Sequence, residues 1–151
     1  MGVTIDIDCP FGYHREFWLG VGMIDCNAFR PPLEGSGSGS LGELVKNHAE
    51  FTFIKSLYEE KAGRVSSWGQ AVSRCPKCNH LSNKLHYRIE HAGGVYEKGY
   101  GCSKCGTAME LLGNGDYDED EGDEPLDLSG VPCPKCGRPF KDAFGISAMW
   151  D

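Results

Sequence analysis

The sequence contains no apolar run long enough to cross a bilayer, and its first residues lack the basic and apolar stretches of a secretory signal. These absences argue against a membrane protein and predict a cytoplasmic one. Thiols stay reduced in the cytoplasm, so the eight cysteines are more readily explained as metal ligands than as disulfides.

Signatures of catalysis are also missing. The chain has no His-Glu-x-x-His motif, no glycine-rich phosphate loop and no nucleophile elbow. We expect each of the five histidines to pack or face solvent, with His48 in the core and with His80 and His86 near a metal site. The sequence therefore predicts a protein that is not an enzyme and has no small-molecule substrate.

Basic residues are absent from residues 116–128, which hold eight of the 22 acidic residues. The rest of the chain is close to neutral, with 15 basic and 14 acidic residues, so the bulk charge gives no strong pull toward nucleic acid. The acidic segment fits a solvated loop, or alternatively a segment that docks on a basic partner. Its carboxylate spacing departs from that of a calcium-binding EF-hand loop.

Glycine and proline are plentiful, with 21 and 8 residues. This composition indicates many turns and a loop-rich chain that needs bound metal ions for stability. Residues 31–40 form a Pro-Pro and Gly-Ser linker, either natural or engineered. Residues 41–62 carry apolar residues at helical spacing and predict one core-packing helix. Ser40 and Glu43 form a possible capping box, and Gly63 stands where a C-terminal cap is expected.

Two segments alternate in the manner of hairpins. Residues 1–20 read as two strands joined by a turn at 9–12, and residues 85–100 read as two strands joined by a turn at 92–94. With the single helix, these hairpins predict an α+β, β-rich fold. Its expected units are an N-terminal hairpin at 1–30 that packs with a C-terminal knuckle and tail at 131–151, a helix at 41–63 and a ribbon at 74–110.

Three cysteine pairs share the spacing Cys-x-x-Cys: Cys75 and Cys78, Cys102 and Cys105, and Cys133 and Cys136. Two intervening residues let the chain turn tightly, so that both sulfurs aim at one point. A residue that tolerates a positive φ is favoured directly after each pair. The residues at these positions are Asn79, Gly106 and Gly137. Two such knuckles supply the four tetrahedral ligands that Zn²⁺ requires.

Cys75, Cys78, Cys102 and Cys105 form the first predicted zinc site, because a hairpin lies between the two pairs. A disulfide or a redox dithiol is the alternative, and a redox pair would need a Cys-x-x-Cys at the start of a helix. A pairing of Cys102 and Cys105 with the third knuckle is also compatible with the sequence.

A second, tentative zinc site joins Cys133 and Cys136 to Cys9, with Cys26 as the fourth ligand and His14 as the alternative to Cys26. The competing interpretation is that Cys9 and Cys26 are buried apolar thiols and that the third knuckle binds metal weakly or not at all. The predicted cofactor is therefore Zn²⁺, with one ion expected and a second possible.

The motifs CPKC, CSKC and CPKCG resemble those of zinc-ribbon proteins with rubredoxin-like knuckles, over residues 75–136. The opening, residues 1–22, is loosely similar to small uncharacterised bacterial proteins with several such knuckles. The turn at 9–12 departs from that pattern because it has only one cysteine. The resemblance implies a fold with structural zinc, and zinc ribbons serve transcription, translation and protein assembly alike.

The favoured function is therefore a non-enzymatic module that binds an unidentified protein. The alternative is a nucleic-acid-associated zinc ribbon, because basic and aromatic residues alternate around the second hairpin. These residues are Arg74, Lys77, Lys84, Arg88, Lys98 and Lys104, together with Tyr87, Tyr96 and Tyr100. Cross-strand packing explains the tyrosines equally well.

Overall fold

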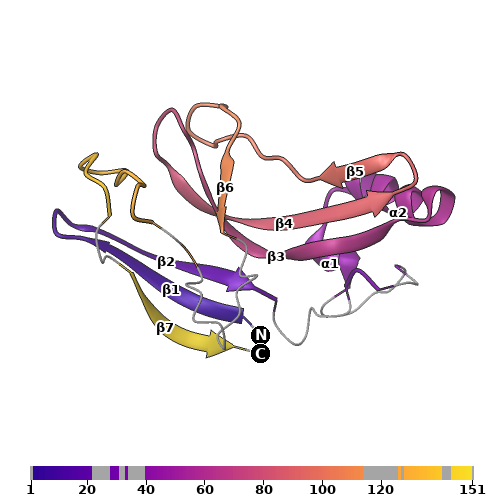
Figure 1. Cartoon of the computed structure of the whole chain (residues 1–151), viewed down its shortest axis with the longest axis horizontal. Helices are drawn as coiled ribbons and strands as arrows, with labels where there is room; N and C mark the ends of the chain where they lie inside the picture. Colours follow the sequence, from indigo (N-terminus) through magenta and orange to yellow (C-terminus); the bar gives the residue numbers. More distant parts are fainter. Residues whose placement is uncertain are drawn as a thin grey trace.

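The computed structural model describes residues 2–21, 28–30, 33, 40–113, 126, 128–140 and 144–150. In these residues the protein is α+β and strand-rich, as predicted, with one antiparallel sheet and two helices. The elements are β1 (Gly2–Cys9), β2 (Tyr13–Gly20), α1 (Leu41–Leu44), α2 (His48–Lys61), β3 (Arg64–Arg74), β4 (Leu81–His91), β5 (Gly94–Glu97), β6 (Glu110–Gly113) and β7 (Phe144–Trp150). The strands follow the order β5-β4-β3-β2-β1-β7, and β6 pairs with β3 beside this path (Figure 1). Neither described helix is both long and apolar enough to span a bilayer.

The predicted N-terminal hairpin forms from β1 and β2, in a register that runs from Gly2 opposite Gly20 to Cys9 opposite Tyr13. The apolar residues of β1 are fully buried, which agrees with their alternation in the sequence. The tail, too short to classify from its sequence, is strand β7 and pairs with the other edge of β1. The N-terminal hairpin and the C-terminus therefore share one part of the sheet.

Strand β3 is the central strand, although its mixed sequence at 64–74 carries no strand prediction. It pairs with β4 over nearly its whole length, with one register shift between Val65 and Ser67. The second predicted hairpin also forms, but its return strand β5 ends at Glu97 and not at Tyr100. Residues 98–109 then run back along β4 to reach β6 (Figure 1).

The two parts of the sheet meet where β2 approaches β3, opposite Gly20 and Gln70. The approach is close because Gly69, at φ +155°, has no side chain: a Cβ there would lie 2.9 Å from the carbonyl oxygen of Gly20. The Asn83 side chain reinforces the junction. Its amide accepts a bond of 2.9 Å from the Trp18 N–H and donates one of 2.6 Å to the Trp18 carbonyl.

The single helix predicted over 41–62 is wrong, because the segment divides into α1 and α2. Asn47, in an extended conformation, accepts a hydrogen bond from the Glu50 N–H and so starts a new helix. Ser40 precedes α1 but makes no side-chain cap, and Ala62 instead of Gly63 takes the left-handed C-cap conformation, at φ 48°. His48 is exposed at the start of α2, which corrects its predicted place in the core.

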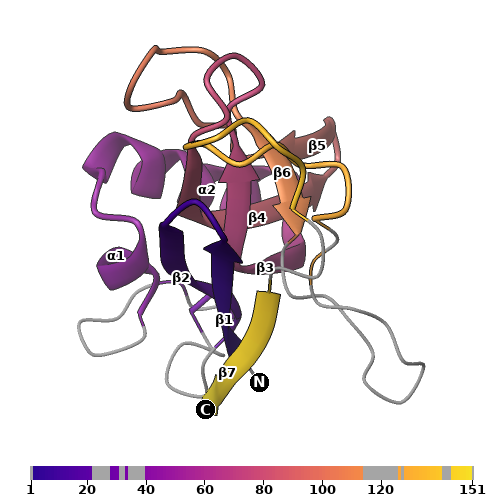
Figure 2. The same cartoon turned by 90° about the vertical axis from the view of Figure 1, so that its left-hand side faces the viewer.

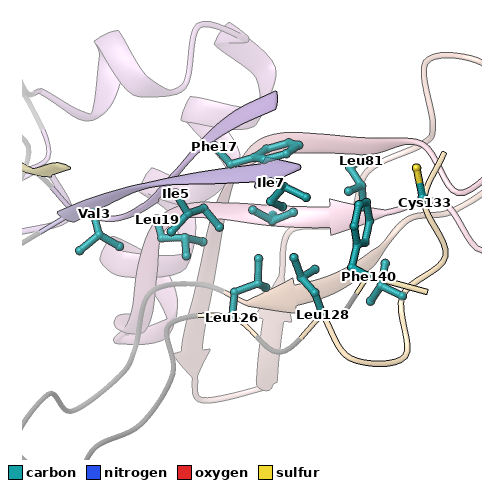
Figure 3. Packing of buried hydrophobic residues seen from close by; sticks show 12 residues of the cluster. Val3, Ile5, Ile7, Phe17, Leu19, Leu81, Leu126, Leu128, Cys133 and Phe140 are labelled. Atoms are coloured by element: carbon teal, nitrogen blue, oxygen red, sulfur yellow. The ribbon is translucent and has the colours of Figure 1, made fainter. Parts of the chain in front are cut away.

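Two apolar cores lie along the sheet. The first packs the inner face of β1 and β2 against Leu126, Leu128, Val131 and Phe140, and Cys133 lies at its end (Figure 3). The second packs α1 and α2 against Tyr87 and Ile89 of β4. The first core thus connects the N-terminal hairpin with the third knuckle.

Candidate metal centres

The three Cys-x-x-Cys turns repeat one backbone structure. In each, the N–H of the residue after the second cysteine donates to the carbonyl of the first cysteine, at 2.8–2.9 Å. That residue has a positive φ in all three turns, 56° at Asn79 and 73° at both Gly106 and Gly137, as the sequence predicts. Local sequence therefore builds the same ligand-presenting turn three times.

The sulfurs of Cys75, Cys78, Cys102 and Cys105 all lie within 4.8 Å of one another. The Cys75 and Cys105 sulfurs are 3.4 Å apart, and the Cys78 sulfur is 3.6 Å from that of Cys102 and 3.8 Å from that of Cys105. Zn–S bonds of about 2.3 Å in a regular tetrahedron place sulfurs about 3.8 Å apart. The cluster therefore has the dimensions of a four-thiolate metal site, and its cysteines are free thiols and not disulfides.

The sheet brings these two knuckles together. The first knuckle is the connection between β3 and β4, and the second lies between β5 and β6. Because β6 pairs with the end of β3, at Arg74 opposite Glu110, the second knuckle returns to the first. The turn at 9–12 and the third knuckle lie at the same end of the molecule (Figures 1 and 2). Cys102 and Cys105 pair with the first knuckle, and the alternative pairing with the third is not adopted.

Hydrogen bonds separate the pKa values of the four thiols. The hydroxyl of Thr107, followed by its backbone N–H, lowers the pKa of Cys105 to about 6. The backbone N–H of His80 also favours the thiolate of Cys78, but burial and the neighbouring sulfurs outweigh it and raise that pKa to about 11. Thiols this close cannot all ionise alone, whereas a divalent cation at their centre would replace the protons.

A second cluster consists of Cys9, Cys133 and Cys136, whose sulfurs also lie within 4.8 Å of one another. The Cys9 and Cys136 sulfurs are 3.4 Å apart, and the Cys133 sulfur accepts a bond of 3.4 Å from the Lys135 N–H. Cys133 is buried in the first core, and the other two thiols pack partly buried against that core. The turn at 9–12 thus brings the Cys9 thiol of the N-terminal hairpin beside the two thiols of the third knuckle.

Among the described residues, no fourth cysteine, histidine, aspartate or glutamate joins this cluster. His14 does not join the three sulfurs: its Nδ1 is 2.6 Å from the Asp8 carboxylate, and both side chains are exposed. Cys26, the favoured candidate, lies outside the described residues. Three of the four predicted ligands are therefore placed together, and the alternative with His14 is not supported by the geometry.

In the fold, several residues of the predicted basic and aromatic patch are buried or paired with carboxylates. Tyr87 is completely buried in the second core and bonds to Glu50 through its hydroxyl. The ammonium of Lys98 is 2.6 Å from the Glu50 carboxylate, and the guanidinium of Arg74 is 3.0 Å from that of Glu110. The sequence predicts two histidines near a metal site. His86 is buried in β4, and of the two only His80 adjoins the first knuckle.

Comparison with protein-family models, with curated proteins and with solved structures gives no match. The resemblance to zinc ribbons therefore rests on the knuckles themselves. What the structure shows directly is two cysteine clusters that could hold a metal ion.

Proposed function

We propose that this is a zinc-binding protein in which Cys75, Cys78, Cys102 and Cys105 hold a structural Zn²⁺ ion. The observation that carries the proposal is the convergence of four sulfurs, from turns separated by 23 intervening residues, at tetrahedral spacing. Two strand pairings, between β3 and β4 and between β3 and β6, bring the two turns together. The second cluster takes a second structural ion with one ligand from outside the described residues.

Four thiolates favour zinc or iron among the biological metals. They leave no position for a bound water, so a metal in the first cluster has a structural role and would not generate a nucleophile. The ion fastens β3, β4 and the return segment at one end of the sheet, and its binding energy adds to the stability of the fold. This chemistry supports a non-enzymatic module.

The proposed partner of that module is a protein. The supporting feature is an apolar surface where α2 meets β5: Phe53 and Val95 are 42% and 52% exposed, and the Phe53 ring stacks edge-on against Tyr96 at 5.0 Å. Exposed aromatic side chains of this kind are enriched where proteins bind one another. The surface lies away from the knuckles, so the metal supports the scaffold and the helix side presents the contact (Figure 1).

Metal analysis of protein purified without added metal tests the proposal. We expect two equivalents of zinc, and iron in their place would contradict the choice of metal. Cys78→Ser should remove one equivalent, because it deletes a ligand of the first cluster. Lys77→Ser is the matched control, since Lys77 occupies the same turn and is exposed. Equal metal content in the two variants, or no metal in the unaltered chain, would refute the site.

A nucleic-acid-associated role is the second candidate, favoured by the charge around the first knuckle. Burial and then the nearby cations Lys104, Arg15 and Lys84 lower the pKa of His80. These groups are close enough to form one cationic region at the knuckle end. Binding of RNA or DNA that weakens steeply with salt would support this role, and no binding at low salt would remove it.

A further inference from the structure

A pocket of about 260 Å³ lies on the face of the sheet that is turned away from the helices, between β3, β4 and the returning segment. Its polar lining includes Ser73, Lys84 and His86, and its apolar lining includes Tyr100, Met109 and Leu111. From this lining we propose that the pocket binds a small organic carboxylate, with Lys84 as the residue that recognises the carboxylate group.

Lys84 supplies the charge that attracts the anion. Its ammonium lies 5.4 Å from the centre of the Tyr100 ring, and in the described part of the chain no carboxylate lies within ion-pair distance of it. Lys98 approaches the same ring at 5.3 Å, but the Glu50 carboxylate already neutralises it. Lys84 is therefore the cation of this pocket that still lacks a counter-charge, and a ligand can provide one.

Ser73 supplies a second donor next to the first. The strand register pairs Ala71 with Lys84 and Ser73 with Ser82, so Ser73 and Lys84 are diagonal neighbours on one face of the sheet. Ser73 is only 5% exposed, and none of the described groups forms a hydrogen bond with its hydroxyl. An ammonium and a hydroxyl side by side match the two oxygens of a carboxylate.

The remaining charged groups do not compete for this position. The His86 ring is engaged on both sides, with Nε2 3.4 Å from the Ser67 hydroxyl and Nδ1 3.9 Å from the Glu97 carboxylate. In the described part of the chain, the Glu97 carboxylate lies beside His86 and not within ion-pair distance of Lys84. Its side chain is half exposed, so water screens its charge.

The apolar wall of the pocket determines which group the ligand carries beside its carboxylate. Leu111 lies opposite Ser73 in β6, and Tyr100 and Met109 are joined by a backbone hydrogen bond of 2.9 Å at the base of the second knuckle. These side chains favour a flat or branched apolar group. One unpaired cation suits a monoanion better than a phosphate dianion. The second knuckle thereby links this pocket to the proposed zinc site.

A titration of the zinc-loaded full chain with benzoate, followed by ¹H–¹⁵N NMR, tests the proposal. We expect shifts centred on Ser73, Lys84 and Tyr100, and much weaker binding of benzamide, which has the same shape without the charge. Shifts centred elsewhere, equal binding of benzamide, or tighter binding of inorganic phosphate would overturn the assignment.

Variants locate the effect on Lys84. Lys84→Gln should weaken benzoate binding at least tenfold, the usual consequence of losing one charge-assisted hydrogen bond, while Lys84→Arg retains it. Lys77→Gln is the control, because it removes an exposed lysine from the first knuckle and leaves the pocket intact. Metal content should be unchanged in all three, and their NMR spectra without ligand should differ from that of the unaltered protein only near the substituted residue. Equal affinity of Lys84→Gln and the unaltered protein would refute the role of Lys84.

Discussion

Replacing Gly69 with alanine should separate the two parts of the sheet. An added Cβ would lie 2.9 Å from the carbonyl oxygen of Gly20, 3.0 Å from its carbonyl carbon and 3.1 Å from a methyl group of Val21. Two of these atoms belong to the backbone of β2, which cannot rotate away as a side chain can. The strands must therefore move apart at the bridge between Gly20 and Gln70.

The magnitude follows from two costs. Overpacking against fixed atoms costs about 1–3 kcal/mol, and an L-residue held at φ +155° costs about 1–3 kcal/mol more. The free energy of unfolding should thus fall by roughly 2–6 kcal/mol, a large fraction of the roughly 5–15 kcal/mol that is typical of a domain.

Denaturant unfolding of the zinc-loaded protein measures this change. Gly99→Ala is the matched control, because nothing lies within 4 Å of the Cβ it would add. Its midpoint should stay the same or rise slightly, since alanine reduces the entropy of the unfolded chain. If both variants unfold at the same denaturant concentration, the close contact between β2 and β3 does not exist as described.

Three further predictions concern the second cluster and the N-terminal hairpin. Cys26→Ser should lower the zinc content from two equivalents to nearly one while His14→Ala leaves it at two, and the opposite result would identify His14 as the ligand. Asn83→Ala should destabilise the fold by about 1–3 kcal/mol in thermal unfolding, because the Trp18 N–H and carbonyl lose their partner; an unchanged midpoint would show that water replaces the amide. The hydrogen bond to Asp8 and its negative charge raise the pKa of His14 above 6.5, so this interaction stabilises the fold fully below pH 6.5 and is lost as the pH rises through the folded pKa. In an NMR titration of the Asp8→Asn variant, the pKa of His14 should lie back in its ordinary range. An unchanged pKa of His14 would refute the pairing.

Much of the candidate site follows from local sequence. Two residues between cysteines, then Asn79, Gly106 or Gly137, are sufficient to encode a tight turn with a positive φ after the second sulfur. The hairpin of β1 and β2 was equally predictable, because alternating apolar residues must face one side of a strand. Each of these features depends on residues that are neighbours in the chain.

Other features could not be predicted, either because a local cap overrides the apolar spacing or because strands distant in sequence decide them. The apolar spacing over 41–62 predicts one helix, but the Asn47 side chain satisfies the Glu50 N–H and starts α2 anew. The sequence of β3 is too mixed to reveal a strand, and it is one because β4 and β6 pair with its two edges. For Tyr87 the sequence left base stacking and packing both open, and the structure decides for packing, because Tyr87 is completely buried in the second core.

The sequence alone determined the three cysteine turns and the first hairpin, since a few consecutive residues set their backbone angles. The tertiary structure decided which knuckle meets which, because only the pairing of β3 with both β4 and β6 returns Cys102 and Cys105 to the first knuckle. It also decided that the third knuckle meets Cys9, through a core shared by the two ends of the chain. Packing and strand register decide which distant segments meet, and both depend on several segments of the chain at once.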